Sequence, residues 1–427
     1  MKASKLTLEN FRSAKNLSID LNPKITLLVG VNGAGKTTII DAMAILLSRA
    51  IVRLQGSNAG IRKIQETDIC NRESSATLEL TCQGNSTQEI TWRLRQARKG
   101  RTVSLFSKMK AAALKELIGW ASEIQSQIEQ NDARINVPLF VYYSTGRSVL
   151  DIPLKIRTRH NFDLLAAYNG SLSSGTKFRE FFEWYRNRED IENEHFRESK
   201  KTIEDPQLKA VRKAIEAFVP EFSNISVKRN PLRMEVTKDG KKLRVDQMSD
   251  GEKCLFAMVG DLARRLAIAN PNRKDVLQGE GIVLIDEIDL HLHPAWQRRV
   301  ITALTDTFPN CQFIVSTHSP QVYGEVQADC IRLLFVDPEY GLSATTPSQA
   351  FGLDSSEILE EAMGTKSRNE GVTAKLTSIF RLIDDEEFPE AKNKITELQE
   401  ELKGSIPETV RAQSLIAMLE PDEGDQE

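Results

Sequence analysis

The sequence predicts an α/β fold in which a mixed β-sheet carries helical insertions, an antiparallel β subdomain and a helical C-terminal region. Three observations lead to this prediction. An apolar run over 25–29 enters a glycine-rich loop that is followed by a helical pattern. Alternating runs over 5–12 and 17–21 indicate antiparallel strands ahead of that loop. Apolar runs over 281–285 and 312–317 indicate two further strands that are buried on both faces.

The composition is that of a globular protein with a full core. The chain has 427 residues, 40% of them hydrophobic and 27% charged, and its formal net charge is −3. This charge does not point to nucleic acid, so DNA binding would need a local basic patch. Five scattered cysteines without a C-x-x-C pair, and a start unlike a signal peptide, predict a cytoplasmic protein. We find no apolar run of about 20 residues and expect no membrane span.

The segment Gly30–Thr37 reads G-x-x-x-x-G-K-T, which is the phosphate-binding loop pattern. Its glycines let successive backbone N–H groups face one anion, and the following helix adds the positive end of its dipole. Lys36 can reach the β- and γ-phosphates, and Thr37 can ligate Mg²⁺. An ordinary glycine-rich turn is the alternative. The expected nucleotide-binding residues are Asn32, Gly33, Ala34, Gly35, Lys36, Thr37 and Thr38.

The first strand ends at Arg12, near the place expected for a nucleotide. Arg12 is therefore a candidate phosphate ligand, with a plain surface arginine as the alternative. Two alternating runs, 76–81 and 89–94, predict a hairpin that continues the antiparallel sheet. A basic cluster then precedes an inserted helical segment at about 103–135, and it is either a solvated surface or a nucleic-acid contact. Its members are Arg93, Arg95, Arg98, Lys99, Arg101, Lys108 and Lys110.

The apolar run 137–143 fits another buried strand. Ser144 and Arg147 follow it, at the strand end that faces the ligand in open α/β sheets. A second inserted helical segment covers about 160–220. Its aromatic residues over 178–185 recur at helical spacing, which favours packing against the sheet over a base-stacking platform.

Ser249-Asp250-Gly251-Glu252 opens an amphipathic helix and forms a second candidate anion site. Ser249 is a good N-cap, and the start of the helix exposes backbone N–H groups and a hydroxyl at its positive end. A capped helix without a ligand would also explain the pattern. Ser249 and Gly251 are therefore candidate nucleotide-binding residues.

The buried run that ends at residue 285 is followed by two carboxylates. Asp286 would complete the Mg²⁺ site, and Glu287 would polarise the attacking water. The next buried run delivers His318 to the same sheet edge, where it can bind a γ-phosphate or the water; a structural histidine is the alternative. His291 and His293 lack a third metal ligand in view, so we favour a role in loop packing.

Together these segments resemble the ABC-type ATPases of the SMC, RecF and Rad50 class over about residues 1–335. The resemblance implies ATP hydrolysis with ATP and Mg²⁺, and it adds Asp289 to the nucleotide site. It further implies a homodimer or higher oligomer in which ATP is clamped between Lys36 of one subunit and Ser249 of the other. One chain supplies one loop and one serine-capped helix, so two composite sites need two chains. The Q-loop glutamine of the class is not evident here. The match is carried by Leu8–Arg12, Gly30–Thr37, Ser249–Glu252, Asp286, Glu287, Asp289 and His318.

A finer resemblance is to the defence-associated ATPases of the Septu type (PtuA-like), which are also found beside some retrons. It implies a partner HNH nuclease that is restrained or released according to the nucleotide state. The resembling segments are Tyr142–Arg147, Phe181–Tyr185, Ile288–Pro294 and Phe351–Leu359.

Residues 336–427 read as helices with an acidic end, a region expected to bind a partner or a second copy; a solvated helical cap is the alternative. About 90 helical residues cannot hold a separate α/β nuclease domain. The sequence thus predicts a regulatory ATPase of an antiviral defence complex. The alternative is a DNA-repair ATPase of RecF or Rad50 type that binds duplex DNA through the basic cluster. A transporter motor is disfavoured because no membrane segment is found.

Overall fold

The computed structural model describes residues 1–58, 60–84, 88–99, 113–130, 135–148, 163–173, 178–200, 204–362, 364, 366 and 368–420. The chain divides into two compact units, Met1–Ile358 and Leu359–Glu427. Across the described ranges, every helix is too short or too polar to cross a bilayer.

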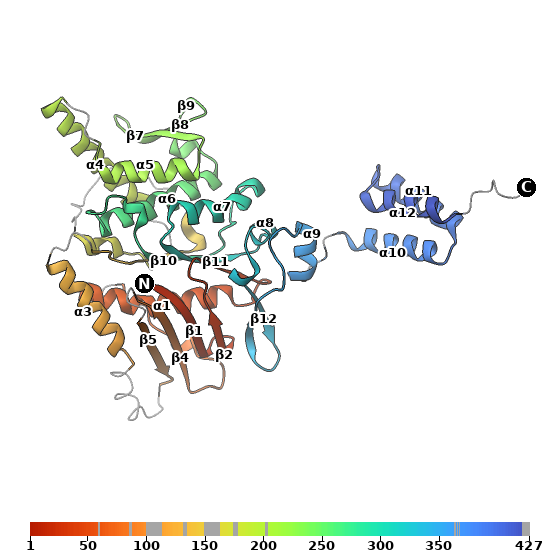
Figure 1. Cartoon of the computed structure of the whole chain (residues 1–427), viewed down its shortest axis with the longest axis horizontal. Helices are drawn as coiled ribbons and strands as arrows, with labels where there is room; N and C mark the ends of the chain where they lie inside the picture. Colours follow the sequence, from red (N-terminus) through yellow and green to blue (C-terminus); the bar gives the residue numbers. More distant parts are fainter. Residues whose placement is uncertain are drawn as a thin grey trace, which may run out of the picture. The chain divides into compact units, whose positions relative to one another are not determined.

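The first unit is built on a ten-stranded mixed sheet (Figure 1). The strands follow the order β5-β4-β1-β2-β13-β12-β3-β11-β10-β6, in which the last five run parallel to one another. Their bounds are β1 (Lys2–Phe11), β2 (Ala14–Asp20), β3 (Ile25–Val29), β4 (Ser75–Gln83), β5 (Glu89–Ala97), β6 (Leu139–Tyr143), β10 (Gly281–Ile285), β11 (Cys311–Thr317), β12 (Ile331–Asp337) and β13 (Gly341–Thr345).

The parallel strands place their carboxyl ends at one edge of the sheet. Strands β3, β6, β10 and β11 are buried along their whole length, as their apolar sequences predict. In the register of these strands, Ile285 pairs with both Tyr143 and Val315, and Thr317 pairs with Val29. The residues that follow these strands therefore meet at the same edge.

The curled sheet wraps around α1 (Lys36–Gln55). Trp92 of β5 donates to the carbonyl of Leu46 in α1, and α1 also packs against β6, β10 and β11. Figure 1 shows α5, α6 and α7 on the other side of β10 and β11. The remaining bounds in this unit are α3 (Lys115–Glu129), α4 (Phe178–Ser199), α5 (Pro206–Phe218), α6 (Asp250–Ala269), α7 (Pro294–Thr307), α8 (Pro320–Tyr323), α9 (Ser355–Glu357), η1 (Glu66–Asp68), η2 (Thr145–Ser148), η3 (Leu164–Tyr168), η4 (Val245–Gln247), η5 (Val276–Gln278) and η6 (Ala328–Cys330).

A separate antiparallel sheet of β7 (Phe222–Arg229), β8 (Leu232–Lys238) and β9 (Lys241–Arg244) leads into α6. With it, the predicted α/β fold, its mixed sheet and its antiparallel subdomain are confirmed. The aromatic residues over 178–185 of α4 are buried, but the rings of Phe178 and Phe181 pack against Phe256 of α6 rather than against the large sheet. Gly260 makes room for them, because a Cβ there would lie 2.8 Å from the Phe181 ring.

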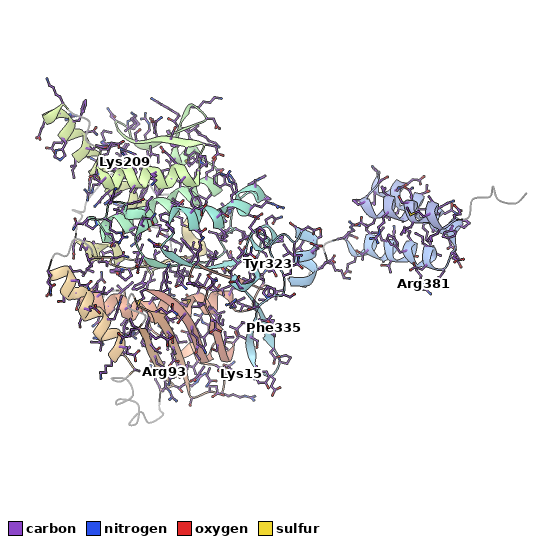
Figure 2. The ribbon with its side chains drawn as sticks, in the orientation of Figure 1. Lys15, Arg93, Lys209, Tyr323, Phe335 and Arg381 are labelled. Carbon is purple, nitrogen blue, oxygen red and sulfur yellow. The ribbon has the colours of Figure 1, made fainter. Side chains whose placement is uncertain are left out.

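The first unit extends beyond residue 335, where we expected the helical region to begin. β12 pairs with β3, and β13 returns antiparallel to β12. This hairpin packs directly on the glycine loop, because a Cβ on Gly30 would lie 2.5 Å from the Leu334 carbonyl oxygen. Figure 2 labels Phe335, whose side chain is exposed on the same hairpin. The sequence analysis missed these two strands because the short run 331–345 does not indicate that it pairs with β3.

The second unit is helical, as predicted for this part of the chain. After η7 (Ile358–Ala362), which crosses the unit boundary, it holds α10 (Glu370–Asp384), α11 (Phe388–Leu402) and α12 (Pro407–Leu419). The three helices share a core of their own, which indicates a separately folded bundle. Its buried members are Leu376, Ile379, Ile383, Phe388, Ala391, Ile395, Leu398, Ala412 and Ile416.

Candidate nucleotide-binding site

The glycine-rich loop connects β3 to the start of α1. Gly33 and Gly35 have φ angles of 82° and 97°, a left-handed backbone that glycine adopts without a Cβ clash. Gly35 is the N-cap of α1, so the free N–H groups of the first helical turn face the loop. Among the predicted loop residues, Asn32 is exposed, whereas Ala34 and Thr38 are buried.

Lys36 holds the loop in shape. Its ammonium group donates to the carbonyl oxygens of Gly30 at 2.7 Å and Val31 at 3.2 Å, and the residue is only 6% exposed. Burial lowers the pKa of Lys36, while the negative charges of Asp286 and Glu287 oppose that shift. A positive charge thus lies beside the helix start and near the carboxylates, as the phosphate-loop motif requires.

Thr37 and Asp286 meet although 249 residues separate them in sequence. The Thr37 hydroxyl donates to Oδ2 of Asp286 at 3.1 Å, and the Ser316 hydroxyl of β11 donates to Oδ1. Asp286 is 4% exposed, so these hydrogen bonds hold a carboxylate that is largely shielded from water. Ser316 was missed from the sequence; its signal was a polar residue within an apolar strand.

The oxygen atoms of Thr37 and Asp286 are suitable ligands for a magnesium ion. Mg²⁺ prefers hard oxygen ligands and is usually held by one or two carboxylates together with substrate phosphates. The Thr37 hydroxyl and the Asp286 carboxylate are such oxygens, and they already lie side by side. Within the described residues no group of three or more His, Cys, Asp or Glu side chains could hold a metal by itself, and waters and substrate phosphates usually complete a Mg²⁺ shell of this kind.

Glu287 adopts an uncommon backbone at the end of β10. Its φ angle is 48°, a left-handed value that is uncommon for non-glycine residues. Its N–H donates to the Ser316 hydroxyl at 2.8 Å, which fixes this turn to β11. Because of this turn, the Glu287 side chain leaves the backbone in another direction than it would from an extended strand. The side chain is half-buried.

Asp289 and His318 lie together at the same edge. Oδ1 of Asp289 accepts from the Thr317 hydroxyl and from the backbone N–H of His318 at 3.2 Å. The structure thus places the Asp289 carboxylate against the end of β11. This hydrogen bond from its N–H fixes the backbone position of His318, whose side chain is half-buried.

The serine-capped helix α6 begins with reciprocal hydrogen bonds. Ser249 is the N-cap, its hydroxyl and N–H both donate to Oε2 of Glu252, and Lys238 of β8 holds the other oxygen of that carboxylate. Burial would raise the pKa of Glu252, but the hydrogen bonds from Lys238 and Ser249 outweigh it and lower the pKa. Ser249 itself is exposed, so it can meet another molecule.

Gly251 places this helix against the segment that follows the carboxylates. A Cβ at Gly251 would lie 2.4 Å from the carbonyl oxygen of His291, so only glycine permits this approach. His291 itself has a φ angle of 64°. Nδ1 of His293 accepts from the N–H of Ala295 and caps α7. Both histidines thus have packing or capping contacts.

Arg12 is paired with carboxylates of its own chain. Its Nε binds Asp68 and its Nη1 binds Asp41, both at 2.9 Å, and Asp41 of α1 also accepts from Arg62 at 2.8 Å. Burial alone would lower the pKa of Arg12, but these two carboxylates outweigh it and raise the pKa. To reach a phosphate Arg12 would have to exchange one of them. No motif in the sequence indicated Asp41, Asp68 or Arg62 as partners.

Tyr142 is close both to the charged group of Arg12, Asp41 and Arg62 and to Asp286 at the sheet edge. The Arg62 guanidinium lies 5.4 Å from the centre of its ring. Burial raises the pKa of Tyr142, and the charges of Asp286 and Asp41 raise it further. Ser144, the next candidate along the chain, is buried after β6, and the side chain of Arg147 lies outside the described part.

Part of the basic cluster is engaged by the protein itself. Arg93 of β5, labelled in Figure 2, forms an ion pair with Glu79 of β4, and Arg95 donates to the Ser75 hydroxyl. Arg98 donates to the carbonyl oxygens of Ile69, Cys70 and Glu73. Arg101, Lys108 and Lys110 lie outside the described residues.

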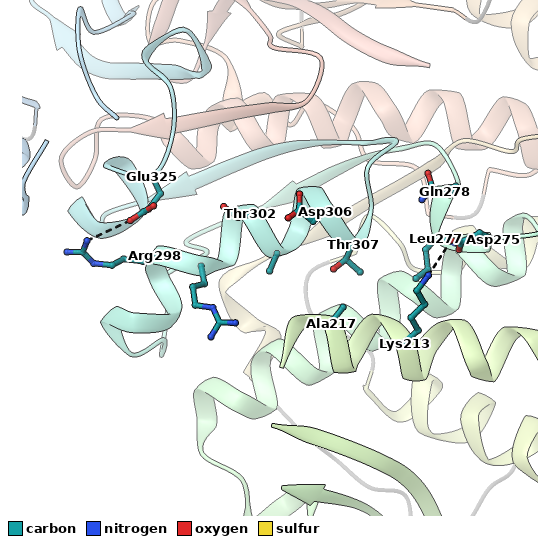
Figure 3. A pocket seen from close by; sticks show the side chains of 12 residues that line it. Lys213, Ala217, Asp275, Leu277, Gln278, Arg298, Thr302, Asp306, Thr307 and Glu325 are labelled. Atoms are coloured by element: carbon teal, nitrogen blue, oxygen red, sulfur yellow. Dashed lines mark hydrogen bonds and ion pairs between the residues drawn. The ribbon is translucent and has the colours of Figure 1, made fainter. Parts of the chain in front are cut away.

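A polar pocket of about 500 Å³ lies between α5, η5 and α7, apart from the glycine loop (Figure 3). Two ion pairs cross its rim, Lys213 to Asp275 at 3.6 Å and Arg298 to Glu325 at 3.7 Å. Its lining mixes acidic and basic groups, and its described members include none of the predicted site residues. It is therefore not part of the candidate site.

Two protein-family models match parts of this chain. The model described as AAA domain matches residues 5–221, which is half of the chain. A second AAA-domain model, which also names the AbiEii toxin of a type IV toxin–antitoxin system, matches residues 125–323.

Curated relatives match most of the chain. Retron Ec83 probable ATPase of Escherichia coli is 31% identical over 86% of this chain and 77% of its own length. Septu protein PtuA of Bacillus thuringiensis is 21% identical over 89% of both chains. The RecF replication and repair protein of Corynebacterium jeikeium (strain K411) is 34% identical over only 20% of this chain and 22% of its own. These names confirm the resemblance that the motifs predicted.

Among solved structures, the SMC head domain from Thermotoga maritima aligns with 82% of this chain and with its own full length. The TM-score is 0.44 and the sequence identity is 15%.

Proposed function

Since the chain belongs to the AAA-domain ATPases of the retron type, which are related to the Septu protein PtuA, we propose that it binds and hydrolyses Mg²⁺–ATP as the regulatory subunit of a defence complex. The observation that carries the proposal is the meeting of Lys36, Thr37 and Asp286 at one sheet edge. A buried ammonium, a hydroxyl and a carboxylate held in this way bind a triphosphate and its cation.

Each residue then has a separate task. Backbone N–H groups of 33–38 and the Lys36 ammonium bind the phosphates. Thr37 and Asp286 would hold a Mg²⁺ ion, which would neutralise phosphate charge. The Glu287 carboxylate accepts the proton of the attacking water. His318 donates a hydrogen bond to the water or the γ-phosphate, and Asp289 fixes the backbone of His318.

A homodimer would complete the site. Ser249 is exposed at the positive end of α6, and its described hydrogen bonds go to Glu252 of the same capping box. We propose that this end of α6 docks on the triphosphate held by a second copy. The arrangement is reciprocal, so two nucleotides would be enclosed by two chains.

Ser249→Arg is expected to abolish ATP-driven dimerisation and to leave ATP binding by the single chain unchanged. The bulky side chain would fill the space at the helix start, which lies apart from the loop that holds the phosphates. Sedimentation with and without ATP measures the dimer, and titration calorimetry at low protein concentration measures binding. Ser18→Arg, at an exposed serine of β2, is the matched control. Dimerisation of the Ser249 variant as in wild type would contradict the proposal.

The second unit is our proposed docking site for a partner HNH nuclease. It has its own core, and α12 exposes apolar side chains, among them Met418, which is 82% exposed. Exposed apolar side chains on a folded helix favour contact with a partner. The nucleotide state of the first unit would then control the bound nuclease.

Removal of residues 359–427 is expected to abolish nuclease binding and leave ATP binding intact. The first unit keeps its sheet, glycine loop and carboxylates, because all of these lie before residue 359. Co-purification with an HNH nuclease partner measures docking, and ATP titration checks the first unit. Met418→Asp in the full chain is the milder variant, with Glu397→Asp on α11 as its control. Full nuclease binding by the truncated chain would place the docking site elsewhere.

In the described part of the basic cluster, three arginines give no support to duplex DNA binding as a second function. The guanidinium groups of Arg93, Arg95 and Arg98 are engaged by carboxylate, hydroxyl and carbonyl oxygens of the protein itself. Phosphate contacts would have to displace these bonds.

A further inference from the structure

A group of charged and polar side chains is buried in the first unit and takes no part in the proposed chemistry. Asp261 and Arg265 of α6 are 1% and 2% exposed, and Tyr143, at the end of β6, is 1% exposed. Burying a charge costs free energy unless partners compensate it. The contacts of this group therefore indicate what it holds in place.

Asp261 is the centre of the group. Its carboxylate accepts from Arg264 Nη2 at 2.6 Å, from Arg265 Nε at 2.7 Å and from the Tyr143 hydroxyl at 3.0 Å. Burial would raise the pKa of Asp261, but the charges of Arg265 and Arg264 outweigh it and lower the pKa to about 2. The carboxylate is therefore charged at neutral pH, and its three donors fix its position.

Tyr143 connects this carboxylate to the catalytic edge. It pairs with Ile285 in β10, and its carbonyl oxygen accepts from the N–H of Asp286 at 2.9 Å. A single residue thus binds the backbone of the candidate magnesium ligand at one end and Asp261 of α6 at the other. Tyr143 is therefore one direct connection between this edge and α6.

The helix α6 contacts the sheet edge that carries Asp286, and the segment after it, at two places. Near its start, Gly251 lies against the backbone of His291, and ten residues later Asp261 binds Tyr143. Ten residues correspond to about 15 Å of helix. Two attachments that far apart fix both the position and the direction of the helix that carries Ser249.

Arg265 extends the connection to the helix of the glycine loop. Its Nη1 donates to the carbonyl oxygens of Ala167 at 2.6 Å and Asn169 at 3.1 Å. The same segment, 163–173, accepts a hydrogen bond from Gln55 at the end of α1 and one from Arg62, which pairs with Asp41 of α1. The buried group therefore contacts, directly or through this segment, the elements that bear both halves of the proposed composite site.

We infer that Tyr143, Asp261 and Arg265 are positioning residues that set the direction in which α6 presents Ser249 to a second subunit. They would thereby connect nucleotide binding in a subunit's own loop to its docking on the partner's nucleotide. The inference rests on the proposed ATP-clamped homodimer. Buried ion pairs often add little stability compared with apolar packing, whereas they can favour one arrangement over its neighbours.

The test removes one hydroxyl. Tyr143→Phe, made in the full-length Glu287→Gln protein, keeps the ring and leaves Asp261 paired with both arginines. We expect the dissociation constant of the ATP-bound dimer to rise about five- to tenfold, the effect of one buried hydrogen bond. ATP affinity at protein concentrations below dimerisation is expected to stay unchanged. Analytical ultracentrifugation measures the dimer, and calorimetry measures nucleotide binding.

Tyr185→Phe is the matched control. Tyr185 is fully buried on α4, and its hydroxyl donates to the Ile225 carbonyl oxygen at 2.8 Å. The same hydroxyl also accepts from Arg212 Nε at 3.0 Å, so its loss is expected to lower the melting temperature at least as much as the loss of the Tyr143 hydroxyl, with dimerisation unaffected. The difference between the two variants separates positioning of α6 from general stability.

Three outcomes would overturn the inference. Equal dimer affinity in Tyr143→Phe and its parent would show that the tyrosine does not position α6. An equal loss of dimer affinity in Tyr143→Phe and Tyr185→Phe would show that the effect reflects general stability and not the position of α6. A parent protein that stays monomeric with ATP would overturn the proposed dimer, and this inference with it, whereas a dimeric parent confines a failure to the inference.

Discussion

Lys36→Ala is expected to lower the affinity for ATP about 100-fold, or about 2.8 kcal/mol. The lysine is the buried positive charge of the loop, and its carbonyl partners, Gly30 and Val31, would be exchanged for phosphate oxygens. Charged hydrogen bonds to phosphate are among the strongest that a protein makes. Calorimetric titration of the purified protein with Mg²⁺–ATP measures the effect.

The control for this prediction is Lys24→Ala, an exposed lysine at the opposite end of β3. It removes the same charge from a position just before β3 without touching the loop. Thermal unfolding of both variants would show that the fold survives. Undiminished ATP binding by the Lys36 variant would mean that the nucleotide, if any, binds elsewhere.

Glu287→Gln is expected to slow ATP hydrolysis about 100-fold or more while ATP binding persists, because the amide cannot accept the proton of the attacking water. The uncharged side chain also removes repulsion from the phosphates, so the ATP-bound dimer is expected to accumulate. Phosphate release measures turnover, and size-exclusion chromatography with ATP measures the trapped dimer. The left-handed backbone at this residue is kept, because glutamine and glutamate have the same shape.

Glu339→Gln, an exposed glutamate after β12, serves as the control for the charge change. Its turnover is expected to equal that of wild type. If Glu287→Gln also turned over at the wild-type rate, Glu287 would not be the base. A loss of binding along with turnover would instead assign the residue to the nucleotide pocket.

Much of the fold could be predicted because local patterns dominate it. The apolar runs gave β3, β10 and β11, and the glycine loop with its helix is a local motif whose geometry follows from its sequence. The N-cap role of Ser249 could likewise be predicted, because serine at a helix start accepts from a backbone N–H of the first turn.

What could not be predicted depends on residues far apart in the chain. Ser316 binds Asp286 only because β11 lies beside β10, and Arg12 is paired with Asp41 and Asp68 only in the folded sheet. The extent of the first unit was misjudged for the same reason. Nothing in the run 331–345 shows that it will pair with β3 rather than precede a helix.

The place of β3 in the sheet has a consequence for biosynthesis. Its two neighbours are β11 and β12, which the ribosome makes nearly 300 residues later, on the order of tens of seconds at ordinary elongation rates. Until then this apolar segment has no strand to pair with, and the glycine loop has no hairpin behind it. The surroundings of the glycine loop are therefore expected to be complete only when most of the protein has been translated.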